Sequence, residues 1–81
     1  MRIAFTKHAL KRSKERRKIS YEQTKEIATK EIEEFFERNP GSLLFEDEIQ
    51  IPSGLYEWVV RIDEDGCCVL VTILDRKFKK K

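Results

Sequence analysis

The chain has 81 residues, of which 40% are charged and 40% hydrophobic, and its formal net charge is +2. This length allows one domain, spanning residues 1–81, with a small hydrophobic core and little room for a second domain. The composition is too apolar for a disordered chain, and no apolar run is long enough to span a membrane. We therefore expect one soluble globular domain without a membrane partner.

The charges are distributed unevenly along the chain. Residues 1–19 hold eight Lys or Arg and one acidic residue, which gives +7, whereas residues 20–65 hold four basic and thirteen acidic residues, which gives −9. Residues 66–81 hold five basic residues and one acidic residue, which gives +4. Two basic ends around an acidic middle make a dipolar molecule, one side of which can attract polyanions. The alternative is that the charges only keep a small domain soluble.

The N-terminal region predicts a short strand followed by a basic helix. Residues 2–5 alternate loosely between polar and apolar side chains, as in a strand, and a helix is expected over residues 6–18. His8, Arg12 and Arg16 recur every four residues, so in a helix they form one polar stripe. An imidazole can exchange a proton near neutral pH, and a guanidinium group can bind a phosphate through two donors. The stripe is therefore a candidate anion-binding site.

A second helix is predicted to begin at Ser20. Its oxygen can accept a hydrogen bond from the amide of Gln23, while the Gln23 side chain reaches back to the amide of Ser20, which together form a capping box. Apolar residues then recur with the helical period as far as Phe36, and Pro40 prevents continuation. Oppositely charged residues four positions apart are expected to pair on this helix, namely Glu26 with Lys30 and Glu34 with Arg38.

The second half of the chain predicts a sheet. Short apolar runs at residues 43–45, 49–51, 55–62 and 67–74 indicate three or four strands. In the run 55–62, the side that carries Trp58 and Val60 is expected to face the core, which leaves Glu57 and Arg61 on an open face. The predicted fold is α+β: a strand, two helices, then a three- to four-stranded antiparallel sheet with both helices on one face. Residues 75–81 are expected to form a basic C-terminal tail.

The two cysteines are expected to be free thiols. Cys67 and Cys68 are adjacent, and adjacent side chains of a strand point to opposite faces, a poor geometry for a disulfide. A chain without a disulfide framework or a signal-peptide pattern fits a reducing cytoplasm. No Cys or His spacing predicts a metal site, and no motif predicts a cofactor.

Two parts of the chain resemble known proteins. His8-Ala9-Leu10-Lys11-Arg12, followed by Glu15-Arg16 and Ile19-Ser20, resembles the opening of a family of small uncharacterised prokaryotic domains related to the RelE and ParE toxin superfamily. The segment from Tyr56 to Asp63 and the run ending in Asp75-Arg76-Lys77 are similar to the last hairpin and basic exit of RelE-like toxins.

Glu57 departs from the pattern of the RelE-like toxins. Those proteins typically carry a basic residue after the tyrosine that enters the middle strand of the final hairpin, and here Glu57 follows Tyr56. The resemblance implies a compact domain that is often encoded beside an antitoxin which masks its basic surface. RelE-like members cut messenger RNA and ParE-like members act on gyrase, so the fold alone does not fix the activity. On this resemblance, the expected partners are RNA or ribosome-bound mRNA and a cognate antitoxin; the oligomeric state stays open.

These observations lead to a functional hypothesis. RNA cleavage by its own 2′-hydroxyl needs a base, an acid and cations on the phosphate. The candidate catalytic residues are His8, Glu57 and Arg61, and the candidate RNA-binding residues are Lys11, Arg12, Arg16, Arg76 and Lys77. We expect RNA binding through a basic surface, with metal-independent endoribonuclease activity as its catalytic form. The alternative is a non-catalytic protein-binding or nucleic-acid-binding module of the same fold.

Each candidate also has a purely structural explanation. His8 could simply hydrogen-bond at the start of its helix. Arg12 and Arg16 could pair with carboxylates of the acidic second helix, which would neutralise the stripe. Glu57 and Arg61 could form part of a cross-strand surface pairing.

Overall fold

The computed structural model describes residues 2–41 and 48–76, and its fold is α+β. The elements are, in chain order, β1 (Ile3–Phe5), α1 (Lys7–Arg17), α2 (Tyr21–Arg38), β2 (Glu48–Ser53), β3 (Tyr56–Ile62) and β4 (Cys68–Asp75). The element order is the one that the sequence predicts. The predicted run 43–45 and most of the predicted tail lie outside the described residues; Asp75 is the last residue of β4 rather than the first residue of a tail.

The four strands form one mixed sheet in the order β1-β4-β3-β2. Strands β2, β3 and β4 are antiparallel neighbours, as expected, but β1 pairs parallel with β4, so the prediction of a purely antiparallel sheet is wrong. Alternation of polar and apolar residues identifies a strand without giving its direction. Parallel pairing needs a long connection between the two strands, and the chain from α1 to β3 provides it.

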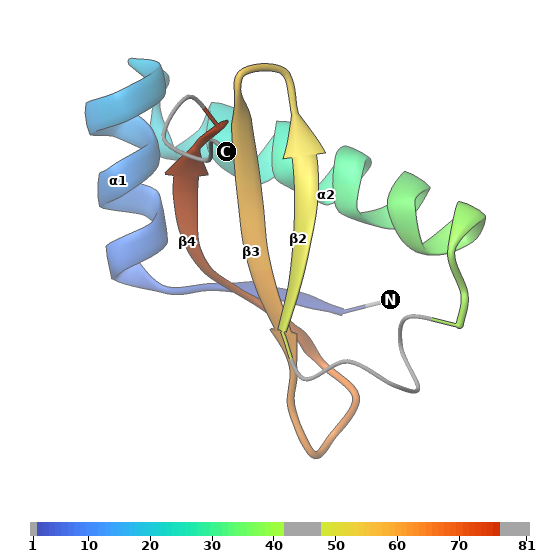
Figure 1. Ribbon diagram of the computed structural model, residues 1–81. Helices are drawn as coiled ribbons and strands as arrows, with labels where there is room; N and C mark the ends of the chain where they lie inside the picture. Colours follow the sequence, from blue (N-terminus) through green and yellow to red (C-terminus); the bar gives the residue numbers. More distant parts are fainter. Residues whose placement is uncertain (1, 42–47, 77–81) are drawn as a thin grey trace.

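The helices form one layer against the sheet. In Figure 1, α2 crosses behind the strands and α1 lies beside β4. The two helices meet through small residues, because Ala9 and Ala28 are fully buried and the buried hydroxyls of Ser13 and Thr24 lie 2.7 Å apart in a hydrogen bond. Small side chains at this contact allow the two backbones to approach closely.

Both helices begin with the hydrogen bonds that their sequences favour. The Thr6 side chain accepts from the Ala9 amide at 3.0 Å at the start of α1. At the start of α2 the predicted capping box is confirmed, with Ser20 and Gln23 bonded in both directions at 3.0 and 3.1 Å. Helix α1 ends at Arg17, and the C-cap residue Lys18 adopts the left-handed conformation with φ 62°.

The hydrophobic core lies between the helices and the sheet. Trp58 and Val60 are fully buried on the side of β3 that the sequence predicts, and they belong to the same core cluster as Ile32 and Leu70. A register shift between Val59 and Val60 shows a β-bulge against β4. Because the core includes the only tryptophan of the chain, its fluorescence reports on this packing.

Both cysteines are free, as expected, and both are buried. Cys68 is fully buried in the core cluster. Burial, together with the neighbouring Cys67, raises the pKa of the Cys68 thiol from 9.0 to about 11. A thiol with such a pKa stays protonated and unreactive at neutral pH.

Candidate nucleic-acid interface

The predicted polar stripe forms on α1. His8 and Lys11 are exposed, and Arg12 and Arg16 are half-buried along the same helix. A rise of 1.5 Å per residue separates His8 from Arg16 by about 12 Å, enough to contact successive phosphates. We call these four residues the α1 cationic surface.

Within residues 2–41 and 48–76 no carboxylate forms an ion pair with Arg12 or Arg16, and the acidic residue of α1 itself, Glu15, is exposed four residues after Lys11. No Asp or Glu oxygen of that part of the chain lies within 4.0 Å of a side-chain nitrogen of Arg12 or Arg16. The pairing with α2 that would explain both arginines structurally is therefore not seen. Unpaired guanidinium groups on one helix create a local positive potential that attracts anions.

Arg17, the next residue along α1, has a different environment. Its guanidinium donates to the Ser53 hydroxyl at 2.8 Å, and its central carbon lies 5.2 Å from the ring centroid of both Tyr56 and Trp58. The Tyr56 hydroxyl in turn donates to the Arg16 carbonyl at 2.8 Å. These contacts fix the last turn of α1 to the sheet.

Glu31 of α2 continues this arrangement. Its Oε1 atom accepts from the Ser53 hydroxyl at 2.5 Å and from the Trp58 indole at 2.6 Å. We call Arg17, Ser53, Glu31 and Trp58 the Glu31 network. It joins α1, α2, β2 and β3 through polar groups, two of which, Ser53 and Trp58, are almost completely buried.

Arg17, Glu31 and Ser53 were not among the site residues predicted from the sequence. The sequence does indicate an inward position for Arg17, because Arg17 lies eight residues after Ala9 and four after Ser13, on the buried side of α1. Glu31 likewise lies three residues after Ala28 and precedes Ile32, both of which are buried. Nothing local in the sequence indicates which distant residues these side chains meet.

The two sides of α1 therefore have different roles. Arg12 and Arg17 are five residues apart, which rotates their side chains by about 140° around the helix axis. Because Arg17 points toward β2 and β3, Arg12 lies on the flank turned away from the Glu31 network. The Arg12 side chain is thus separated from the interior contacts that hold the helix in place.

The sheet candidates do not form one group. Glu57, expected to be exposed, is only 8% exposed, and its carboxylate lies 3.7 Å from the Nε of Arg76. Arg76 also donates to the Gly54 carbonyl at 3.3 Å. Arg61 is exposed and stands opposite Glu48 in the register of β2 and β3. Glu57 and Arg61 are four positions apart along β3, a distance of about 13 Å, so their side chains do not pair with each other.

Arg61 instead lies toward the start of α1. It lines a hollow of about 400 Å³ together with Thr6, the residue that caps this helix two positions before His8. Helix α1 runs alongside β4. At its start, the Thr6 hydroxyl donates to the Val71 carbonyl of β4. At its end, the Arg16 carbonyl accepts from Tyr56, the residue that pairs with Asp75 of β4.

The predicted residues thus fall at two ends of the sheet. His8 and Arg61 belong to the end where α1 begins, and Arg76 and Glu57 to the end where α1 finishes. Lys77 lies outside the described residues.

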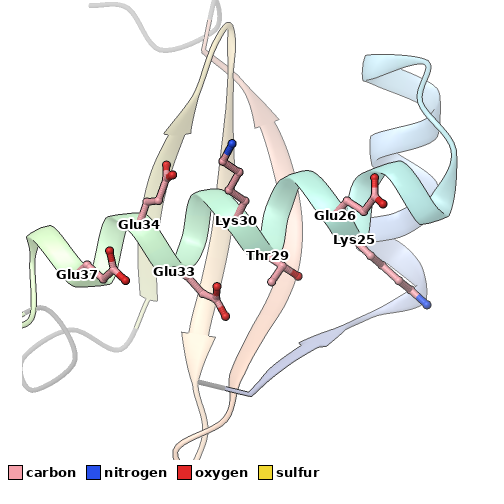
Figure 2. Close-up of a pocket in the computed structure, with 7 residues that line it drawn as sticks. All are labelled: Lys25, Glu26, Thr29, Lys30, Glu33, Glu34 and Glu37. Atoms are coloured by element: carbon pink, nitrogen blue, oxygen red, sulfur yellow. The ribbon is translucent and has the colours of Figure 1, made fainter.

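A second surface has the opposite character. The outward side of α2 carries a shallow hollow of about 640 Å³ whose side chains fan away from the helix (Figure 2). It is lined by Lys25, Glu26, Thr29, Lys30, Glu33, Glu34 and Glu37. With four carboxylates and two ammonium groups, this surface repels a polyanion, so it is not a candidate for RNA contact.

The described part of the chain shows neither a metal-binding cluster nor a membrane-spanning helix. Residues 2–41 and 48–76 contain no group of three or more His, Cys, Asp or Glu placed to hold a metal ion. None of their helices is both long and apolar enough to cross a membrane. Comparison of the chain with models of protein families, with curated proteins and with solved structures finds no match.

Proposed function

We propose that the protein binds RNA through the α1 cationic surface. The observation that carries the proposal is that Arg12 and Arg16 form no ion pair with any carboxylate of the described residues. Both lie within residues 1–19, which hold eight basic residues and one acidic residue. Phosphate contacts from Lys and Arg supply most sequence-independent affinity for nucleic acid. The sequence resemblance to RelE-like toxins favours RNA over other polyanions, and free buried cysteines fit a reducing cytoplasm.

Chemical-shift mapping by NMR tests where RNA binds. Addition of a short single-stranded RNA to the ¹⁵N-labelled chain should shift amides of residues 7–17 and leave those of residues 25–37 nearly unchanged. An RNA that shifts mainly the α2 amides, or none at all at low salt, contradicts the proposal.

The catalytic form of the proposal centres on His8. The exposed His8 imidazole lies one helical turn before Arg12, so it could act as the acid or base while the guanidinium groups of α1 hold the phosphate. Arg61 lies toward the same end of α1 and is assigned to the phosphate, whereas Glu57 is engaged with Arg76 at the other end of the sheet. This division of the predicted catalytic residues favours the alternative, RNA binding without cleavage.

A cleavage assay separates the two forms. If the protein cuts RNA, cleavage should persist in EDTA and fall by about 10²- to 10⁴-fold in His8→Ala, because proton transfer by a positioned side chain contributes about that much. Lys7→Ala, an exposed neighbour, is the matched control. Binding without any cleavage by the unmodified chain selects the non-catalytic module. Growth arrest on expression without a partner, relieved by His8→Ala, would support a toxin that an antitoxin neutralises.

A further inference from the structure

A groove separate from the α1 cationic surface lies between the second half of α2 and the end of β2. Its volume is about 330 Å³, and we call it the Glu31 groove. It is lined by Glu31, Glu34, Phe35, Arg38, Asn39, Ile51, Pro52, Ser53 and Gly54. Neither RNA binding nor cleavage, as proposed above, uses these residues.

The carboxylate of Glu31 is held in position within this groove. Its Oε1 atom accepts two hydrogen bonds, from the Ser53 hydroxyl and the Trp58 indole, and these two residues are 2% and 0% exposed. Its Oε2 atom has no hydrogen bond or ion pair with the described residues. A half-buried carboxylate whose orientation is fixed in advance can bind a cation without the entropic cost of ordering a side chain.

The rest of the lining suits a cationic group on a short carbon chain. Glu34 lies one helical turn after Glu31 and adds a second carboxylate, while Phe35, Ile51 and Pro52 supply apolar surface. The predicted pair of Glu34 with Arg38 is not formed, because no ion pair within 4.0 Å joins these residues. Glu34 is therefore open to an external cation.

We propose that the Glu31 groove binds a guanidinium or primary ammonium group, carried either by a small free amine or by an Arg or Lys side chain of a peptide. Two cations of the chain weaken the binding of an external cation. Arg17 donates to the Ser53 hydroxyl that in turn donates to Glu31, and Arg38 is one of the residues that line the groove. We therefore expect an affinity in the millimolar range. The proposal stands independently of RNA binding.

The single tryptophan provides the measurement. Because the Trp58 indole donates to Glu31, a cation on this carboxylate should change the fluorescence of Trp58. Agmatine and the peptide acetyl-Gly-Arg-Gly-amide are titrated separately at constant ionic strength. Both should give saturation, and the tighter of the two identifies the source of the cation. The same peptide with citrulline in place of arginine, which has the same shape without the charge, should give no saturation.

Substitutions locate the site. Glu31→Gln keeps an oxygen acceptor for Ser53 and Trp58 but removes the charge, so binding should weaken by about tenfold or more. Glu34→Gln should also weaken binding, and Arg38→Gln should tighten it. Glu33→Gln, an exposed change of the same charge on α2, should have no effect.

Three results would overturn the proposal: no saturation by either probe up to tens of millimolar, equal affinity in Glu31→Gln, or equal weakening by Glu33→Gln. If circular dichroism shows that Glu31→Gln does not fold, the substitutions at the exposed residues Glu34 and Arg38 test the proposal instead. The opposite signs expected for Glu34→Gln and Arg38→Gln then support the proposal, and the same sign for both contradicts it.

Discussion

At the scale of single residues, position around α1 decides what an arginine does. Arg17 lies over two aromatic rings and bonds Ser53, whereas Arg12, about 140° away around the helix, has no carboxylate partner in the described chain. The same residue type therefore serves stability at one position and is available for a ligand at the other.

Unfolding measurements distinguish these roles. Arg17→Ala removes a hydrogen bond and two cation–π contacts, so we expect the free energy of unfolding to fall by about 1–3 kcal/mol. Arg12→Ala, the matched control on the other flank, should change it by no more than about 0.5 kcal/mol. Urea denaturation followed by Trp58 fluorescence measures both. Equal losses would mean that the Glu31 network does not hold α1.

The buried Cys68 predicts a loss of stability at high pH. Its folded pKa of about 11 exceeds the ordinary value of 9.0, so the folded state favours the protonated thiol. The resulting stabilisation is complete below pH 9 and is lost as the pH rises toward 11. Cys68→Ala should lower stability throughout but show a flatter decline between pH 9 and 11 than the unmodified chain. Parallel pH profiles for the two proteins would argue against this titration.

At the scale of elements, the features that could be predicted from the sequence are those set by residues close together in the chain. The capping box at Ser20 and the core side of β3 at Trp58 were both predictable, because each depends on neighbours in the chain. The parallel partner of β1 was not, since pairing Ile3 with Cys68 depends on the path of the whole chain. Glu31 could be placed on the inner side of α2, but Ser53 and Trp58 lie 22 and 27 residues away.

The contact between the two helices gives a prediction at this scale. Ser13 is fully buried where α1 meets α2, so Ser13→Leu should overpack the contact and reduce the free energy of unfolding by about 1–3 kcal/mol. Lys11→Leu introduces the same side chain on the exposed side of α1 and should change stability by less than about 0.5 kcal/mol. Thermal unfolding of both variants tests this, and a stable Ser13→Leu protein would contradict the close approach of the helices.

At the scale of the whole molecule, charge separates by helix. The α1 cationic surface, with His8 and Lys11 exposed and Arg12 and Arg16 half-buried, lies on one helix, and the carboxylates of Figure 2 lie on the outward side of the other. This separation explains how a chain with a net charge of only +2 can attract a polyanion. For the RNA binding that we propose, it also predicts orientation, with the RNA on the α1 side and away from the carboxylates of α2.

The salt dependence of RNA affinity tests the central claim most directly. Each phosphate contact contributes about 0.7 to the slope of log K against log salt for single-stranded nucleic acid, so Arg12→Gln with Arg16→Gln should reduce the slope by about 1.4. Lys25→Gln with Lys30→Gln, which removes the same charge from α2, should leave the slope unchanged. Fluorescence anisotropy of a labelled RNA measures all three proteins. Equal slopes for the unmodified chain and the arginine variant, or equal reductions in both variants, would contradict binding through α1.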